Sequence, residues 1–172
     1  MKQVRKLPIG IQSFEVIREN DYQYVDKTAL IYRLVSTEIP YFLCRPRRFG
    51  KSLLLSTFEA YFSGRKELFE GLAIAELETK WEKYPVLHLD LNAEKYDSVD
   101  SLNSILSGHL HRWEVLYGKV EVEDTLSRRF AGVIRRAFEK TGKKVVVLID
   151  EYDKPMLSAI LDEELSKAYR FL

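Results

Sequence analysis

An unbroken apolar run, VVVLI at residues 145–149, is the feature that most constrains how this chain can fold. A continuous run rich in β-branched residues is typical of a strand that is covered on both faces of a parallel sheet. Apolar residues at helical spacing predict helices over about 27–37, 99–117 and 124–140, and the alternating segment PVLHLDLN at 85–92 predicts a second strand. Strands that alternate with helices indicate an α/β fold, with a mostly parallel sheet flanked by helices.

The composition is that of an ordinary globular protein. The 172 residues are 46% hydrophobic and 31% charged, and the formal net charge of +1 gives no support for nucleic acid as an obligatory partner. The single cysteine, Cys44, excludes an intrachain disulfide and fits a reduced, cytoplasmic setting. Neither a secretory signal nor an apolar stretch long enough for a membrane span is present, so we expect no membrane partner. The sequence leaves any protein partner unknown.

The first part of the chain predicts a cap and a helix ahead of the sheet. Residues 8–25 surround a polar cluster at Glu19–Asp21, and we expect two short strands or a loop with a hairpin there. Asp26 stands at the N-cap position of the predicted helix over 27–37. We therefore expect a single domain over residues 1–172, in which 1–40 form an N-terminal cap and helix and 41–172 form the core.

The segment RPRRFGKS, residues 45–52, matches most of the phosphate-loop pattern G-x-x-x-x-G-K-S/T. The apolar run YFLC at 41–44 predicts the preceding strand, and Leu54, Phe58 and Phe62 recur at the spacing of a following helix. Arg45 stands where the first glycine of the pattern would be. The alternative is a plain helix start in which Lys51 is a solvated surface residue.

The chemistry of a helix start explains why the matching half of the motif matters. The first N–H groups of a helix have no intrahelical partner and carry partial positive charge, and Gly50 lets the backbone approach an anion. Lys51 then reaches the β- and γ-phosphates, and the Ser52 hydroxyl ligates Mg²⁺. The full set of predicted phosphate-binding residues is Arg47, Arg48, Phe49, Gly50, Lys51, Ser52 and Leu53, although Arg47 and Arg48 could equally pair with acidic side chains or face solvent.

Two carboxylates, Asp150 and Glu151, directly follow the buried run. Ligands of α/β proteins bind beyond the carboxyl ends of the strands. Asp150 is therefore predicted to hold Mg²⁺ as a Walker-B aspartate, and Glu151 to act as the general base that polarises the attacking water. The alternative is that Asp150 and Asp153 are turn and capping residues before a helix that begins near Pro155; we favour that interpretation for Asp153.

With both motifs in place, the chain resembles the AAA-ATPase-like family found in many bacterial proteins. The resemblance rests on IGIQSFEVIREN, YVDKT, FLCRPRRFGKSLLLS, PVLHLDLN and VVVLIDEYDKP, and the arginine-rich phosphate loop is itself typical of that family. It implies a P-loop ATPase of the additional-strand type, with Glu151 as the catalytic glutamate. A nuclease-like C-terminal domain often follows in longer relatives, and we do not carry nuclease activity over to this chain.

The additional strand of such folds lies between the phosphate-loop strand and the Walker-B strand, and comes from sequence after the Walker-B segment. The sequence given stops at Leu172, before such a strand, so we expect these residues to be the N-terminal part of a longer protein. The expected function is Mg²⁺-dependent ATP binding with hydrolysis of the phosphoanhydride. The alternatives are a nucleotide-binding switch module with little turnover, and the ATPase component of a DNA-processing system.

Several other residues have two interpretations. Asp90 could orient water or Mg²⁺, or make a structural hydrogen bond. The rings of Phe14, Tyr22 or Tyr24 could stack on adenine. The histidines show no metal-ligand spacing. The arginines of the helix over 124–140 are predicted to form a solvated face rather than a nucleic-acid surface or an arginine finger; they are Arg128, Arg129, Arg135 and Arg136.

Overall fold

The computed structural model describes residues 5–37, 39–44, 46, 48–92, 96–159 and 165. The chain forms two compact units, Met1–Tyr84 and Pro85–Leu172, and each is described by itself. A single domain over the whole chain stays a prediction. Within the described residues, none of the helices has the length and apolar character that crossing a membrane requires.

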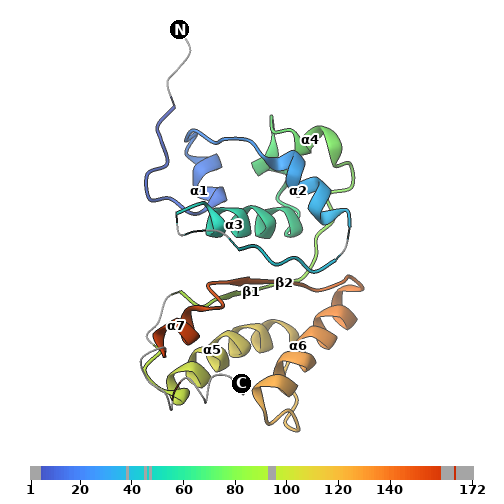
Figure 1. Ribbon diagram of the computed structural model, residues 1–172. Helices are drawn as coiled ribbons and strands as arrows, with labels where there is room; N and C mark the ends of the chain where they lie inside the picture. The colour runs from blue at the N-terminus through green and yellow to red at the C-terminus, as the bar shows by residue number, and fades with distance from the viewer. Residues whose placement is uncertain are drawn as a thin grey trace. The chain divides into compact units, whose positions relative to one another are not determined.

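The first unit is helical (Figure 1). It contains α1 (Phe14–Glu19), α2 (Thr28–Val35), α3 (Lys51–Phe62), the 3-10 helix η1 (Lys66–Phe69) and α4 (Ile74–Leu77). A cluster of buried apolar residues joins all five elements and the turn after η1; it comprises Phe14, Ile31, Ala60, Leu68, Phe69, Leu72 and Ile74. Removing these apolar side chains from water is the main stabilising contribution to this unit.

The helix α1 corrects the hairpin expected within residues 8–25. The Ser13 side chain accepts a hydrogen bond from the Val16 N–H at 3.2 Å and so caps the helix. Phe14 and Ile17, three positions apart, are both fully buried. A helix of six residues is too short to show helical periodicity in sequence or to be stable alone, so contacts with neighbouring elements must hold it.

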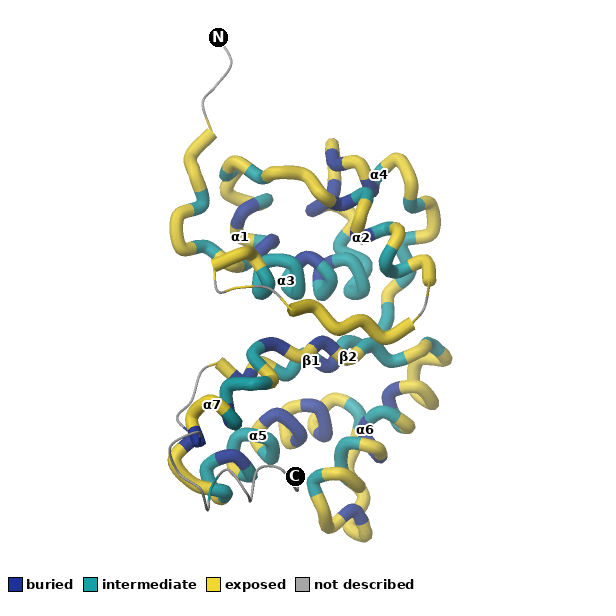
Figure 2. The backbone as a smooth tube through the Cα atoms, viewed as in Figure 1, coloured by how far each residue is buried: buried dark blue, intermediate teal, exposed yellow. Residues whose placement is uncertain are grey.

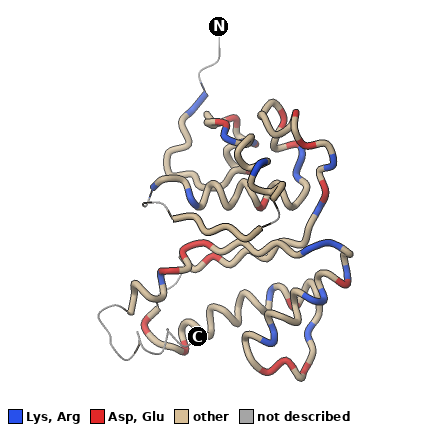
Figure 3. The backbone as a smooth tube through the Cα atoms, turned by 45° about the vertical axis from the view of Figure 1, so that its right-hand side comes forward, with Lys and Arg blue, Asp and Glu red and all other residues tan. Residues whose placement is uncertain are grey.

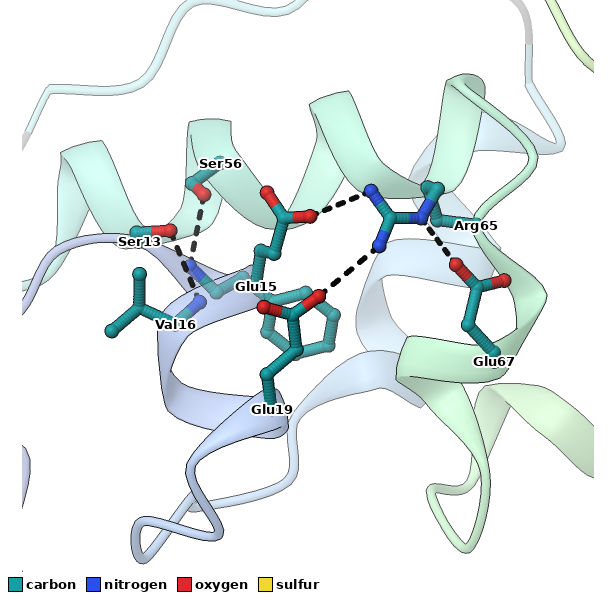
Figure 4. Close-up of polar contacts among 8 residues, drawn as sticks. Ser13, Glu15, Val16, Glu19, Ser56, Arg65 and Glu67 are labelled. Atoms are coloured by element: carbon teal, nitrogen blue, oxygen red, sulfur yellow. Dashed lines mark hydrogen bonds and ion pairs between the residues drawn. The ribbon is translucent and has the colours of Figure 1, made fainter.

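Contacts with α3 and its C-terminal turn supply that support (Figure 4). The Phe14 N–H donates to Ser56 Oγ in α3 at 2.9 Å. Arg65, which follows α3, donates to Glu15 Oε1 at 2.6 Å and to Glu19 Oε1 at 3.3 Å, and it also pairs with Glu67. Three carboxylates around one guanidinium thus join α1 to the end of α3 and to η1.

Asp26 acts at the start of α2, as predicted, although Lys27 is the residue at the N-cap position. One Asp26 oxygen accepts from the N–H and the hydroxyl of Thr28, at 2.8 and 2.7 Å, and the other accepts from the Ala73 N–H at 2.7 Å. Partial burial opposes ionisation, but these hydrogen bonds outweigh it and hold the pKa of Asp26 below its usual value. Asp26 thereby joins the start of α2 to the start of α4.

Residues 41–44 have no regular secondary structure and do not form the predicted strand. A strand requires a hydrogen-bonded partner, and the sheet described for this chain contains only β1 and β2. The residues of this segment are exposed (Figure 2), with Tyr41 at 52%, Phe42 at 70% and Leu43 at 40%. The thiol of Cys44 is also exposed and makes no disulfide.

The second unit has the α/β character predicted from sequence. It contains β1 (Val86–Asp90), α5 (Val99–Tyr117), α6 (Leu126–Thr141), β2 (Val146–Asp150) and α7 (Lys154–Ser158). The two strands are parallel and in register from Val86↔Val146 to Asp90↔Asp150. Parallel pairing requires a crossover, which α5 and α6 provide on one side of the strand pair (Figure 1).

The helices α5 and α6 bury part of the strand pair. Leu87 of β1 is fully buried and packs with Leu110, Trp113 and Val133. The expectation that β2 is covered on both faces is wrong for the described residues, since Val147 and Ile149 are 37% and 45% exposed. With β1 as its one described neighbour, β2 keeps an open edge, and side chains near that edge have fewer neighbours.

The solvated arginine face predicted for α6 is wrong for two of its four residues. Arg129 forms a two-point ion pair with Glu114 of α5, at 2.7 and 2.9 Å, and donates to Ser107 Oγ at 2.7 Å. Only 14% of the Arg129 side chain and 3% of the Glu114 side chain are exposed. The hydrogen bonds from Arg129 hold the pKa of Glu114 below its usual value, against the effect of burial.

Arg136 forms the second buried pair. Its guanidinium donates to Glu123 Oε1 at 2.7 Å, and the two side chains are 13% and 8% exposed. Arg128 and Arg135, at 66% and 62%, are exposed as predicted. A partner 13 to 15 residues away along the chain leaves no periodic signal in the helix itself, which is why the sequence did not reveal these pairs.

Candidate functional site

Gly50, directly before α3, has a left-handed backbone conformation. Gly50 occupies the N-cap with φ 74° and ψ 28°, in the left-handed region that favours glycine. A Cβ at this position would meet nothing within 4 Å, so the constraint on Gly50 comes from the backbone and not from a neighbour. The first backbone hydrogen bond of α3 runs from the Leu54 N–H to the Gly50 carbonyl, at 3.0 Å.

No side chain caps this helix in the described structure. Ser13, Ser98 and Thr125 cap α1, α5 and α6 with their hydroxyls, whereas the N-cap of α3 is a glycine and makes no such bond. The N-terminal end of a helix carries partial positive charge, which favours an anion near Gly50.

The residues around Gly50 differ in exposure. Arg48, with φ 68°, and Phe49 and Gly50 are exposed. Lys51, Ser52 and Leu53 are half-buried, and the Leu53 side chain packs against the core of the first unit, so its backbone N–H is the group that it can offer to a ligand. Arg45 and Arg47 lie outside the described residues.

The carboxyl end of the strand pair carries the predicted acidic residues (Figure 3). Asp150 is the last residue of β2 and 7% exposed, and its Oδ1 accepts from the Glu151 N–H at 3.0 Å. Glu151 is half-buried and adopts φ 52°, a left-handed conformation that costs a non-glycine residue roughly 1–2 kcal/mol. Asp90 lies in register with Asp150, and its Oδ1 accepts from the Asn92 N–H at 2.8 Å. Of the two interpretations of Asp90, this bond is the structural hydrogen bond.

The turn after Glu151 leads into α7, which carries Pro155 in its first turn as predicted. Asp153 stands at the N-cap, but its side chain makes no capping hydrogen bond, so its predicted capping role is wrong. Lys154 instead donates through Nζ to the carbonyl and the side-chain oxygen of Asn92, the latter at 3.1 Å. Sequence reasoning missed Lys154; its position three residues after Glu151 was the available signal.

The aromatic residues proposed to stack on adenine have other neighbours. Phe14 is fully buried, with ring centroids 5.2 Å from Tyr24 and 4.8 Å from Phe69, so it has no face left for a base. Burial raises the pKa of Tyr24, and its hydroxyl is hydrogen-bonded with Thr57 of α3. Phe14 and Tyr24 therefore contact α3 as part of the core, and a stacking role for Tyr22 stays untested.

The sequence predicts no zinc site at the histidines, and His109 has other partners. Nε2 of His109 is 3.2 Å from the Asp90 carbonyl and Nδ1 is 2.8 Å from Arg112, and burial lowers the pKa of His109. Among the described residues, no three His, Cys, Asp or Glu side chains gather as a metal site would require. Magnesium in nucleotide sites needs less, because one or two protein ligands act together with phosphates and water.

The two halves of the predicted site belong to two different units. Residues 48–53 surround the start of α3 in the first unit, and Asp90, Asp150 and Glu151 share the end of the strand pair in the second unit. That the two halves serve one ligand stays a prediction.

Comparison with known proteins gives the family. A family model described as a predicted AAA-ATPase matches residues 8–172. The chain is 39% identical over 170 residues to a protein of Azotobacter chroococcum mcd 1 described as an uncharacterized protein in the vnfD 5′ region. That match covers 96% of this chain and 32% of the relative, so the chain spans about a third of the relative's length. No solved structure matches the chain. The family model covers nearly the whole sequence, and the chain belongs to the AAA-ATPase-like family of predicted AAA-ATPases.

Proposed function

We propose that this chain binds Mg-ATP and hydrolyses it. The observation that carries the proposal is the start of α3, where a left-handed glycine replaces a side-chain cap directly before Lys51 and Ser52. The N–H groups of Gly50 to Leu53 and the Lys51 ammonium bind the phosphates, and Arg48 adds positive charge. The family to which the chain belongs supports this choice of ligand.

The oxygen ligands for magnesium are the Ser52 hydroxyl and the Asp150 carboxylate. Both are hard donors of the kind that Mg²⁺ prefers. Asp150 is 7% exposed, and a carboxylate with so little access to water is stabilised when it faces a cation. When bound, Mg²⁺ neutralises charge on the phosphates.

Glu151 is the proposed general base. It follows Asp150 directly, and its left-handed backbone fixes how its side chain leaves the strand end. A carboxylate in this role accepts a proton from the attacking water, and such a base contributes roughly 10²–10⁴-fold to the rate. A protein that only stores ATP has no need of this group, which favours hydrolysis over a pure switch module.

Binding is tested by calorimetric titration of ATP and ADP with and without Mg²⁺. Lys51→Ala is expected to weaken ATP binding by roughly 10–100-fold, as loss of a charged hydrogen bond predicts. Lys66→Ala, at an exposed lysine of η1 in the same unit, is the matched control and should bind as the wild type does. Failure of the folded wild-type protein to bind either nucleotide would overturn the proposal.

Turnover separates the alternatives. Glu151→Gln should retain ATP binding while phosphate release falls by roughly 10²–10⁴-fold. Unchanged turnover in this variant would remove Glu151 from its role, whereas tight binding without turnover in the wild type would favour the switch module. Stimulation of turnover by DNA would favour the DNA-processing alternative.

A further inference from the structure

Lys154 makes a long-range contact that joins α7 to the end of β1. Its Nζ donates to the backbone carbonyl of Asn92 and, at 3.1 Å, to the Oδ1 of the same residue. Asn92 lies 62 positions before Lys154 in the chain. Asn92 is itself held, because its N–H donates to Asp90 Oδ1 at 2.8 Å. The ammonium of Lys154 therefore fastens the first turn of α7 to the strand that lies in register beside β2.

The same residue holds Glu151 through its backbone. The Lys154 N–H donates to the Glu151 carbonyl at 3.0 Å, while the Glu151 N–H donates to Asp150 Oδ1 at 3.0 Å. Both peptide groups of Glu151 are thus bonded within the turn, and its φ of 52° persists because the surroundings fix it. A left-handed conformation at a residue that is not glycine relaxes readily when such bonds are lost.

We propose that Lys154 is a positioning residue for Glu151, an inference that rests on the proposed function of Glu151 as general base. Lys154 does not touch the reacting atoms in this assignment. Its ammonium anchors the turn on Asn92, its N–H fixes the Glu151 carbonyl, and together they set the direction of the Glu151 side chain. Charge-assisted hydrogen bonds to two oxygens of one residue give that anchor both strength and direction.

The first test separates turnover from binding. In steady-state ATPase assays, Lys154→Met is expected to lower kcat by about 100-fold, the loss that a small displacement of a reacting group produces, with the Kd for Mg-ATP changed less than about 2-fold. Lys154→Arg should recover much of the rate, because a guanidinium also donates to two oxygens. Lys140→Met is the matched control: Lys140 Nζ donates to the Leu116 carbonyl at 2.9 Å in the same unit, and this variant should keep the wild-type kcat.

The second test asks whether Lys154 acts through Glu151. In a Glu151→Gln background, Lys154→Met should cause no further loss of turnover, because the group that it positions is already inactive. Thermal melts of every variant are the control for folding. If Lys154→Met does not fold, Lys154→Arg takes its place in the comparison.

The outcomes distinguish the two proposals. Loss of turnover in Glu151→Gln with an unchanged rate in Lys154→Met overturns the role of Lys154 alone. The role of Lys154 is also overturned if Lys154→Met weakens ATP binding by as large a factor as it lowers kcat. It is overturned as well if the reductions in kcat from Glu151→Gln and Lys154→Met multiply in the double variant. A wild-type chain without ATP binding overturns the proposed function itself.

Discussion

Two of the four non-glycine residues with positive φ in the described structure, Arg48 and Glu151, belong to the two candidate motifs. The other two are Asp21, in a turn of the first unit, and Trp81, in a segment of that unit without regular secondary structure. Backbone strain of this kind gathers at functional sites because the surrounding structure can hold a side chain in a direction that relaxed backbone would not give. Sequence identified both residues as candidates but could not give their backbone angles.

Gly132 of α6 lies so close to a neighbouring side chain that a larger residue would collide with it. A Cβ there would lie 1.9 Å from Glu123 Oε1. Glu123 would have to move, and its buried hydrogen bond to Arg136 would break. We expect Gly132→Ala to lower the free energy of unfolding by about 1–3 kcal/mol, measured by urea denaturation.

Gly108 of α5 provides the control for that prediction. A Cβ at Gly108 would meet nothing within 4 Å. Gly108→Ala should therefore stabilise the chain by about 0.5–1 kcal/mol, because alanine loses less conformational entropy than glycine in a helix. Stabilisation of similar size in Gly132→Ala would show that Glu123 moves aside without cost.

The pairing of α5 with α6 depends on buried charge as well as on apolar contact. Arg129→Met removes the partner of Glu114, whose side chain is 3% exposed, and leaves a carboxylate with little access to water. We expect a loss of about 3–5 kcal/mol in the free energy of unfolding. Arg128 is on the same helix as Arg129 and forms an exposed pair with Asp124, and Arg128→Met should cost about 0–1 kcal/mol. Similar effects of the two variants would contradict the buried role of Arg129.

The hydrogen bonds by which Asp26 connects α2 to α4 should stabilise the fold less at acidic pH. Hydrogen bonds lower the pKa of Asp26 in the folded chain, so its contribution to stability is present above the unfolded pKa of about 3.9 and is lost as the pH falls through the folded value. Asp26→Asn should therefore be less stable than the wild type near pH 6, and the difference should shrink below about pH 4. Urea denaturation across this pH range measures it, and a constant difference at all pH values would exclude the Asp26 carboxylate as its source.

Sequence predicted the longer elements well and the shorter ones poorly. The helices α5 and α6 and the strands β1 and β2 lie within about two residues of their predicted ranges, because periodicity repeated over many residues leaves few alternatives. The helix α1 and residues 41–44 were assigned wrongly, since a short segment takes its state from its partners. The site motifs could be found because their residues are consecutive in the sequence. The contact from Lys154 to Asn92 could not be found, because the two residues are 62 positions apart and only the fold brings them together.

At the scale of the whole molecule, each unit has its own apolar core. Ile74 belongs to the core of the first unit, and Leu87 belongs to a core of the second. Both side chains are fully buried, so Ile74→Ala and Leu87→Ala should each cost about 2–5 kcal/mol. Amide hydrogen exchange followed by mass spectrometry should show faster exchange mainly in the unit that carries the substitution. Equal acceleration in both units would mean that the chain unfolds as one cooperative body.

The exposed thiol of Cys44 has a practical consequence for studying this protein. It is the one cysteine of the 172-residue sequence and lies six positions before Gly50, so a maleimide fluorophore attaches at a single place without any substitution. Its emission then follows the neighbourhood of residues 48–53 directly while nucleotide is added. The same accessibility means that alkylation or oxidation of an untreated sample would fall beside the loop under study, and a reductant belongs in every assay buffer.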